Sequence, residues 1–253
     1  MTAHLREHRI PRRSWTRAAA AGAVAFLVAL GPAELGADVI AFDALAKGEV
    51  LSDQFVNSHG VTFSAINNRR GHPDTLVIFD TQRPSGGDYD LSYPWAGGNL
   101  GSQRLEKIFI IAENVRDRDH DGLVDHPDDE ARGGTVIITL DFLADSFGFD
   151  QVDRDDCNGD HVRFYSNGML LDTVTYDEMA LMDGTIDYGN RKANTLPDIT
   201  AEMVGGTFDE VRIAVSGSHG FDNVRFTAVP EPMTATLVGA GALLVLLRRR
   251  RRK

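Results

Sequence analysis

The sequence has little cysteine and none of the familiar catalytic signatures. Cys157 is the only cysteine among 253 residues, so no disulfide can form within the chain. There is no G-x-S-x-G elbow, no H-E-x-x-H pair and no glycine-rich phosphate loop. A glycosidase needs only two suitably spaced carboxylates, and the sequence cannot select such a pair. We therefore expect no catalytic residues, and a glycan-acting enzyme remains the minor alternative.

Basic residues are scarce between the two ends of the chain. The whole sequence has 26 Lys and Arg against 37 Asp and Glu. Residues 1–37 hold five basic and two acidic residues, and residues 230–253 hold six basic and one acidic. The central part keeps 15 basic and 34 acidic residues, a net charge of −19. This charge repels nucleic acid and attracts cations, so we expect no nucleic-acid partner.

Residues 38–228 also lack a long apolar pattern with the period of a helix. The nearest approach is a weak pattern at residues 43–53. Short β-branched and aromatic runs between turn signals indicate strands instead, and Asn167–Gly168 predicts a two-residue hairpin. About 190 residues can bury one core. We expect an all-β domain, an antiparallel two-sheet sandwich and most simply a jelly roll. The expected strands are residues 61–66, 75–79, 107–112, 135–142, 147–152, 161–166, 169–176, 208–215 and 221–227.

The first 37 residues have the composition of a secretory signal peptide. Five arginines lie between residues 6 and 17, and the apolar residues 18–30 follow them. Leu35-Gly36-Ala37 offers a small residue before a cut ahead of Asp38. The adjacent arginines at 12 and 13 leave a twin-arginine route open beside ordinary secretion. We expect an N-terminal signal helix that signal peptidase removes from an exported protein.

The end of the chain has three parts in a fixed order. Pro230, Glu231 and Pro232 are followed by the uncharged, mostly apolar residues 233–247, and then by five arginines and a lysine. An apolar stretch before a basic cluster predicts a transmembrane helix in the inner membrane. At about 15 residues it is short for a span, which usually needs ~20.

This arrangement resembles the PEP-CTERM sorting signal, which an exosortase handles in Gram-negative bacteria that make exopolysaccharide. The resemblance implies that residues 229–253 are a sorting signal with motif, transmembrane helix and Arg cluster. It also implies transient anchoring in the inner membrane, followed by arrival at the cell surface or in the extracellular matrix. An ordinary tail anchor is the alternative, but it needs no Pro-Glu-Pro. The expected organisation is therefore signal peptide 1–37, β-sandwich domain 38–228 and sorting signal 229–253.

Residues 117–128 (DRDHDGLVDHPD) fit the oxygen-ligand pattern D-x-D-x-D-G-x-Φ-D-x-x-D, where Φ is apolar. Calcium takes six to eight hard oxygens, Gly122 permits the sharp turn, and Val124 can turn inward as an apolar anchor. So many carboxylates would repel one another without a cation. We predict a Ca²⁺ site formed by the side chains of Asp117, Asp119, Asp121, Asp125 and Asp128 and the carbonyl of Leu123.

The loop resembles the dockerin version of the EF-hand loop, with Asp128 where an EF-hand has Glu. Its predicted flanks are strands, so we expect an EF-like loop inserted between strands. Asp129 and Glu130 are alternatives to Asp128 as the last ligand. His120 and His126 lie at non-ligand positions and leave a softer metal open. A solvated acidic turn is the alternative that binds no metal.

Two other acidic groups give weaker patterns. The first lies between two expected strands and consists of Asp150, Asp153, Asp155, Asp156, Asn158 and Asp160. Asp153, Asp155 and Asn158 are candidate ligands of another cation, but no register fits well, and a solvated turn is the favoured alternative. Residues 78–91, 108–142 and 217–227 resemble a β-sandwich domain common among PEP-CTERM surface proteins. In jelly-roll carbohydrate-binding modules, an Asp that starts the last strand often helps to hold a structural calcium. By that resemblance, Asp43 and Asp222 are candidate ligands of a second calcium ion.

Aromatic residues gather in the long polar loop of residues 80–106, which carries Tyr89, Tyr93 and Trp95. Long loops in compact domains are usually functional or held down. Aromatic rings on such a loop can stack on sugar rings, so these three are candidate glycan contacts. The alternative is that they fold back over the edge of the sheet.

These patterns predict an exported, calcium-stabilised protein of the cell surface or extracellular matrix. We expect exosortase processing and an association with exopolysaccharide and biofilm. A carbohydrate-binding protein is the second hypothesis, and a glycan-acting enzyme is the third.

Overall fold

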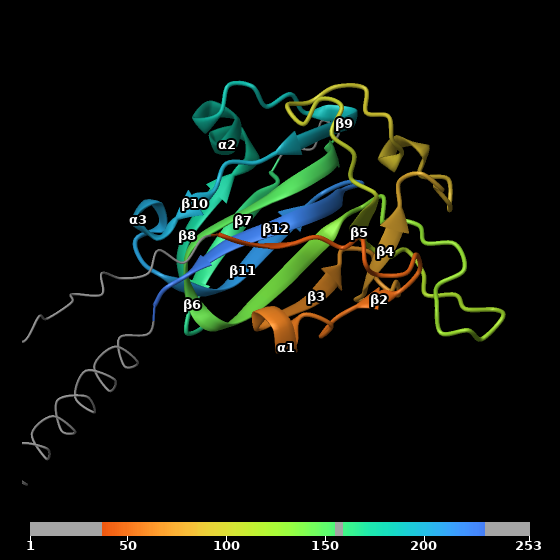
Figure 1. Ribbon diagram of the computed structural model, residues 1–253, viewed down its shortest axis with the longest axis horizontal. Helices are drawn as coiled ribbons and strands as arrows, with labels where there is room; N and C mark the ends of the chain where they lie inside the picture. The colour runs from red at the N-terminus through yellow and green to blue at the C-terminus, as the bar shows by residue number, and fades with distance from the viewer. Residues whose placement is uncertain (1–36, 155–158, 231–253) are drawn as a thin grey trace, which may run out of the picture. The chain divides into compact units, whose positions relative to one another are not determined.

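The computed structural model describes residues 37–154 and 159–230 (Figure 1). The predicted transmembrane segment, most of the signal peptide, Glu231, Pro232 and four residues of the second acidic run (155–158) lie outside these ranges. No helix within the described ranges is long and apolar enough to cross a membrane.

The described chain is mostly antiparallel β-sheet, which confirms the all-β prediction. Every pair of strands in it is antiparallel. The strands found there are β1 (Asp38–Ile40), β2 (Val50–Leu51), β3 (Val61–Asn67), β4 (Leu76–Asp80), β5 (Lys107–Ile111), β6 (Gly134–Arg154), β7 (His161–Ser166), β8 (Met169–Thr175), β9 (Gly189–Thr195), β10 (Ile199–Thr200), β11 (Phe208–Val215) and β12 (Gly220–Ala228).

Strand β6 organises the sheet because its 21 residues pair with different neighbours along their length. Its first part pairs with β3 and β11, and its second part pairs with β12, β9 and β10. All twelve strands of the described chain therefore join one sheet, with a central order β2-β4-β5-β12-β6-β11-β7-β8. The strand pairing alone therefore does not divide the strands into the two sheets that a sandwich requires.

One expected gap in the strand pattern is wrong. Residues 135–142 and 147–152 belong to the same strand, because Ala144 between them pairs with Phe208 on one side and Ala228 on the other. The hairpin at residues 167–168 is confirmed, since Asn167 and Gly168 have φ of 50° and 76°. The weak helical pattern at residues 43–53 forms no helix, and turns and β2 occupy this region.

Short helices lie in the connections between strands. They are α1 (Val56–His59), η1 (Tyr89–Leu91), α2 (Tyr176–Met182) and α3 (Ala201–Val204). Helix α2 begins with a capping box, in which Thr175 and Glu178 satisfy each other's backbone N–H groups. These helices have at most seven residues each, which is too short to give a periodic pattern in the sequence.

The main core is rich in phenylalanine. Phe63 on β3 lies 5.7 Å from Phe109 on β5, and Phe109 stacks on Phe221 of β12 at 5.2 Å between ring centroids. All three side chains are at most 1% exposed. Full burial of a Phe side chain contributes roughly 1.5–3 kcal/mol, so these rings stabilise the sheet strongly.

A second core lies on the opposite face of β4 and β5. Alternate residues of β5, such as Phe109 and Ile110, belong to the main and the second core respectively. Residues of the two long loops cover this second core, including Leu91 and Leu105 from the first loop and Val124 from the second. The loops that carry the candidate sites are therefore packed onto the sheet.

Candidate metal centre

The acidic loop between β5 and β6 is fixed to the sheet at Val124. This side chain is 4% exposed and points into the second core, as the sequence pattern predicts. The Val124 N–H donates to the carbonyl of Gly48 at 2.8 Å. Gly48 has a φ of +85°, and a Cβ there would lie 2.3 Å from the Val124 carbonyl oxygen. Only glycine allows this close approach without rearrangement.

Three of the predicted calcium ligands converge. One carboxylate oxygen from each of Asp117, Asp119 and Asp125 lies within 4.8 Å of the others. Asp117 accepts hydrogen bonds from the backbone N–H groups of His120 at 2.7 Å and Gly122 at 3.0 Å. Gly122 has a φ of 88°, which gives the expected sharp turn.

The electrostatics of this group differ between its members. Partial desolvation opposes ionisation of Asp117, but the N–H donors, Gly122 first, act more strongly and lower its pKa. For Asp119, the N–H of Asp121 favours the charged form. Desolvation and the charges of Asp121 and Asp125 outweigh that donor and raise the pKa of Asp119. A cation bound among these oxygens would remove this repulsion.

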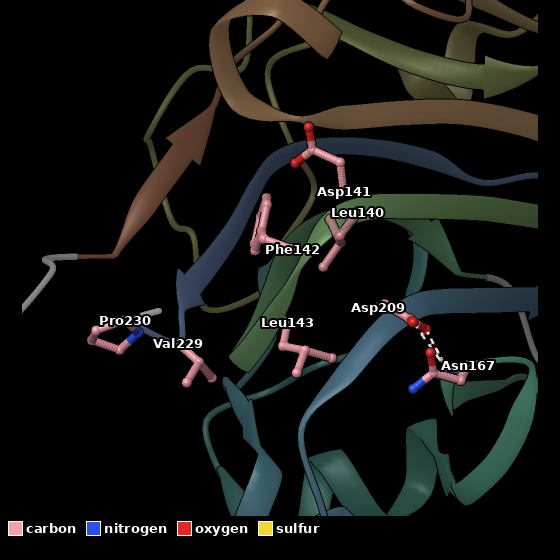
Figure 2. Close-up of a pocket in the computed structure, with 8 residues that line it drawn as sticks. All are labelled: Leu140, Asp141, Phe142, Leu143, Asn167, Asp209, Val229 and Pro230. Carbon is pink, nitrogen blue, oxygen red and sulfur yellow. Dashed lines mark hydrogen bonds between the residues drawn. The ribbon is translucent and has the colours of Figure 1, made fainter. Parts of the chain in front are cut away.

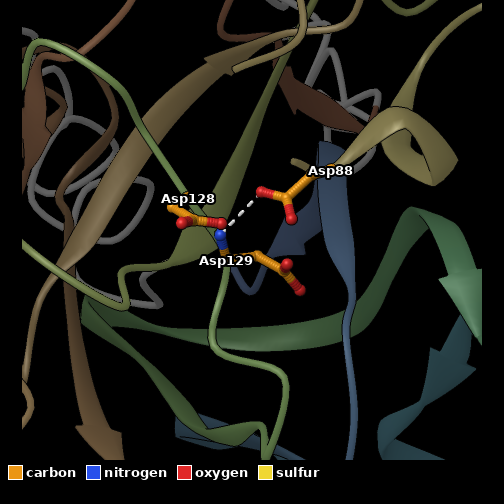
Figure 3. A group of neighbouring side chains, drawn as sticks. All are labelled: Asp88, Asp128 and Asp129. Carbon is orange, nitrogen blue, oxygen red and sulfur yellow. Dashed lines mark hydrogen bonds between the residues drawn. The ribbon is translucent and has the colours of Figure 1, made fainter. Parts of the chain in front are cut away.

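The other predicted ligands of the loop lie differently. The Asp121 carboxylate accepts from the Leu123 N–H at 2.9 Å, and it is not one of the three carboxylates that converge. Asp128 does not join the group. Its carboxylate lies instead with those of Asp88 and Asp129, in a second cluster with oxygens within 4.8 Å of one another (Figure 3).

The second cluster joins the two long loops. The Asp129 N–H donates to Asp88 at 2.8 Å (Figure 3), and the Ser85 hydroxyl donates to the Pro127 carbonyl at 2.8 Å. Desolvation and the nearby charge of Asp129 raise the pKa of Asp88 to about 10. Burial likewise raises the pKa values of Asp128 and Asp129. No local pattern pointed to Asp88, because it lies 40 positions before Asp128 in the sequence.

A small cleft of about 120 Å³ lies between the two acidic groups. Asp125 of the first group and Asp128 of the second both line it. Arg116, Arg118 and His126 line it as well, so positive side chains border the acidic loop.

The structure brings Asp43 and Asp222 close enough to interact. Asp222 is 2% exposed, and burial, followed by the charges of Asp43 and Asp150, raises its pKa to about 8. Asp43 accepts a hydrogen bond from the Lys107 N–H at 3.0 Å. The pair remains a candidate calcium site that lacks a third described carboxylate within bonding range.

Two described carboxylates of the acidic run, Asp150 and Asp160, form buried ion pairs. Asp150 pairs with Arg225 at 2.8 Å. Asp160 pairs with Arg154 at 3.1 Å and with His219 at 3.3 Å. Hydrogen bonding and the charge of His219 outweigh desolvation and lower the pKa of Asp160.

The three candidate glycan contacts differ in how far they are exposed to solvent. Tyr93 and Trp95 meet edge to face at 5.6 Å, and Arg104 lies over the Tyr93 ring at 5.0 Å. Trp95 packs partly against the second core, and its indole N–H donates to the Gln103 carbonyl at 2.9 Å. Tyr89 on η1 is 72% exposed. Trp95 thus folds back over the sheet, while Tyr89 faces solvent.

A separate cleft of about 360 Å³ lies where the described chain ends (Figure 2). Phe142 and Leu143 of β6 line it together with Val229 and Pro230. On its other side, the Asn167 N–H donates to both carboxylate oxygens of Asp209 at 3.0–3.1 Å. The first proline of the Pro-Glu-Pro triplet therefore packs beside the sheet.

Comparison with known proteins gives no family. No protein-family model matches the chain, and no curated protein matches it. One solved structure is similar, the K2 cleaved adhesin domain of Lys-gingipain (Kgp), at 12% identity and a TM-score of 0.37. The match covers 76% of this chain and 99% of that one. A likeness this distant indicates neither a shared fold nor a shared function.

Proposed function

We propose that this protein is an exported, calcium-stabilised component of the cell surface or extracellular matrix of a Gram-negative bacterium, without enzymatic activity. The observation that carries the calcium part is the convergence of Asp117, Asp119 and Asp125 in a loop fixed to the core by Val124. Three carboxylates at this separation suit a calcium ion, whose oxygen ligands lie at about 2.3–2.6 Å.

The calcium ion would hold the loop closed over the second core. Asp121 and the Leu123 carbonyl would complete the ligand set beside the three converged carboxylates. An ion that binds only the folded chain stabilises it by about 2.7 kcal/mol at 100 times the dissociation constant. Extracellular calcium fills weak sites of about 10⁻⁴–10⁻³ M affinity, so such a site suits an exported protein.

We propose that the sheet closes as a two-layer sandwich of jelly-roll type. The contact between Phe63 and Phe109 supports this arrangement, because these rings come from strands β3 and β5, which do not pair with each other. Strand β6 would then pass from one layer to the other.

Sorting is the second part of the proposal, and it is supported by the sequence alone. Signal peptidase would remove residues 1–37, residues 233–247 would hold the chain in the inner membrane, and an exosortase would act at Pro230-Glu231-Pro232. The test is localisation of a Glu231→Ala chain in an exosortase-bearing host. We expect it to stay with the inner membrane, whereas wild-type localisation of the variant would contradict exosortase sorting.

Association with extracellular polysaccharide is the partner we propose. A true carbohydrate-binding face is the second candidate, favoured by the exposed Tyr89 and by the Tyr93–Trp95 pair. Binding to an exopolysaccharide array that disappears in Tyr89→Ala and Trp95→Ala would support it. Turnover of any glycan would instead support an enzyme.

Thermal unfolding of the full chain tests the calcium proposal. We expect millimolar calcium to raise the melting temperature relative to excess EDTA, and the rise to be smaller in the Asp119→Asn/Asp125→Asn variant than in the wild type. Asp145→Asn, which changes an exposed carboxylate on β6, is the matched control and should behave as wild type. Equal melting temperatures of the wild type in calcium and EDTA would mean that the loop is only a solvated acidic turn.

A further inference from the structure

The two long loops meet at three carboxylates that the calcium-loop pattern does not explain. Asp88 comes from the loop after β4, and Asp128 and Asp129 come from the end of the loop before β6. One oxygen of each lies within 4.8 Å of the others, and the three side chains converge in Figure 3. Oxygens bound to one calcium ion at about 2.3–2.6 Å are up to ~5 Å apart, so the spacing needs no rearrangement.

The carboxylate of Asp129 is the second observation. The residue is 5% exposed, and its buried Oδ2 atom accepts no hydrogen bond. Asp88 and Ser218 lie beside this carboxylate, but neither donates a hydrogen bond of normal geometry to Oδ2. A buried carboxylate oxygen is normally paired with a donor or a metal, so this atom is available to a bound cation.

Protein cations do not supply that ligand. Within residues 37–154 and 159–230, no Lys, Arg or His side chain forms an ion pair with Asp88, Asp128 or Asp129. If all three carboxylates were ionised at this separation, they would repel one another strongly when removed from water.

The backbone around the cluster permits this close approach. Gly86 has a φ of +72°, and a Cβ there would lie 2.4 Å from the Asp128 carboxylate carbon. Two hydrogen bonds fix the loops beside it, from Ser85 to Pro127 and from the Asp129 N–H to Asp88. The bond from Ser85 to Pro127 thus holds the two loops together without involving the carboxylates.

We propose that Asp88, Asp128 and Asp129 form a second site for a divalent cation that prefers oxygen ligands, with calcium as the first candidate. It is separate from the site of Asp117, Asp119 and Asp125. The ion would link the two long loops that cover the second core.

Calcium binding to the full chain, measured by equilibrium dialysis, tests this proposal. We expect two ions per wild-type chain and one in Asp88→Asn/Asp129→Asn. The Asp119→Asn/Asp125→Asn variant should keep the other ion, and Asp145→Asn should keep both. Asn is close in shape to Asp and still accepts the Asp129 N–H at position 88.

The outcomes separate the two sites. One ion per wild-type chain, lost only in Asp119→Asn/Asp125→Asn, would overturn the second site and leave the proposed loop site intact. One ion per wild-type chain, lost only in Asp88→Asn/Asp129→Asn, would support the second site and overturn the site of Asp117, Asp119 and Asp125.

A measurement on the wild type guards against variants that fail to fold. Crystals of the full chain grown with calcium should show anomalous density within bonding distance of Asp88, Asp128 and Asp129. Density at Asp117 and Asp119 alone would overturn the second site. A single ion in the cleft between Asp125 and Asp128 would also overturn it.

Discussion

At the scale of single residues, buried carboxylates decide how the protein responds to pH, and they act in opposite directions. Asp222 is buried near other acidic groups, and its pKa is raised to about 8. Asp160 is equally buried, but its partners are Arg154, His219 and Ser216, and its pKa is lowered. Burial alone therefore does not set the sign, because the partners decide which protonation state is favoured.

We predict that Asp222→Asn stabilises the protein at pH 8 in EDTA. Folding raises the pKa of Asp222 from 3.8 to about 8, so the folded chain keeps a proton that the unfolded chain releases. The stabilising effect of that proton is complete below pH 3.8 and is lost as pH rises to about 8. The gain in the variant should be on the order of a few kcal/mol. Urea unfolding at pH 5 and pH 8 measures it, with Asp145→Asn as control. A variant no more stable than wild type at pH 8 would contradict the raised pKa.

We predict the opposite for Asp160→Asn. The lowered pKa of Asp160 means that its charged form stabilises the folded chain above the unfolded value of 3.8. This stabilisation is lost as pH falls through the folded value. Breaking the pairs with Arg154 and His219 should cost about 3–5 kcal/mol at pH 7, because the buried Arg154 guanidinium loses its buried carboxylate and keeps the exposed Asp177. Urea unfolding should show that the difference from wild type shrinks on acidification. A constant difference from pH 7 to pH 3 would rule out this origin.

At the scale of elements, the contact between residues 46–49 and the acidic loop fixes the candidate metal centre to the sheet. Gly48 donates to Ile78 on β4 at 2.9 Å and accepts from Val124 at 2.8 Å. The acidic loop is thus attached through Gly48 to strand β4, one face of which forms part of the second core. A loop with this attachment can bring Asp117, Asp119 and Asp125 together without helices on either side.

We predict that Gly48→Ala destabilises the protein far more than Gly71→Ala. Both glycines have a positive φ, +85° and +87°, but a Cβ at Gly71 meets nothing within 4 Å. The control should therefore show only backbone strain, about 1 kcal/mol. At Gly48 the Cβ would lie 2.3 Å from backbone, so the loop must move, and we expect more than about 3 kcal/mol. Urea unfolding of both variants gives the difference, and equal losses would show that the contact is unimportant. Gly48→Ala should also weaken calcium binding at Asp119.

The sequence predicts local features well and distant contacts poorly. Strands β7 and β11 begin and end where the alternation of apolar residues predicts. The join within β6 could not be predicted, because partners on both sides of Ala144 hold residues 143–146 extended. In the same way, spacing alone placed Asp128 with the calcium loop. The fold places it with Asp88, from a loop that no local pattern connects to it.

At the scale of the whole molecule, negative charge is in large excess, with 37 acidic against 26 basic residues. Several carboxylates gather in the loops above the second core instead of being spread evenly. Self-repulsion of this kind destabilises a compact chain and is screened by salt.

We predict that salt stabilises the protein in EDTA and has a much smaller effect in calcium. Raising the ionic strength from about 0.01 to about 0.1 M shortens the Debye length from about 30 to about 10 Å, which weakens repulsion between carboxylates. Bound calcium would already have removed most of it at the two loops. Melting temperatures at both salt concentrations, with EDTA and with calcium, test this expectation. An equal salt effect in both would place the repulsion elsewhere on the surface.

The pairing of β1 with β12 gives the molecule a direction. Asp38 lies opposite Phe226, so the start of β1 and the end of β12 lie side by side at one end of the sheet (Figure 1). The acidic loops lie toward the other end of β12, where Gly220 pairs with Ile110. Nine residues of strand span roughly 30 Å. Under the anchoring proposed above, beyond Pro230, the acidic loops would lie at the end of the sheet farthest from the point of attachment.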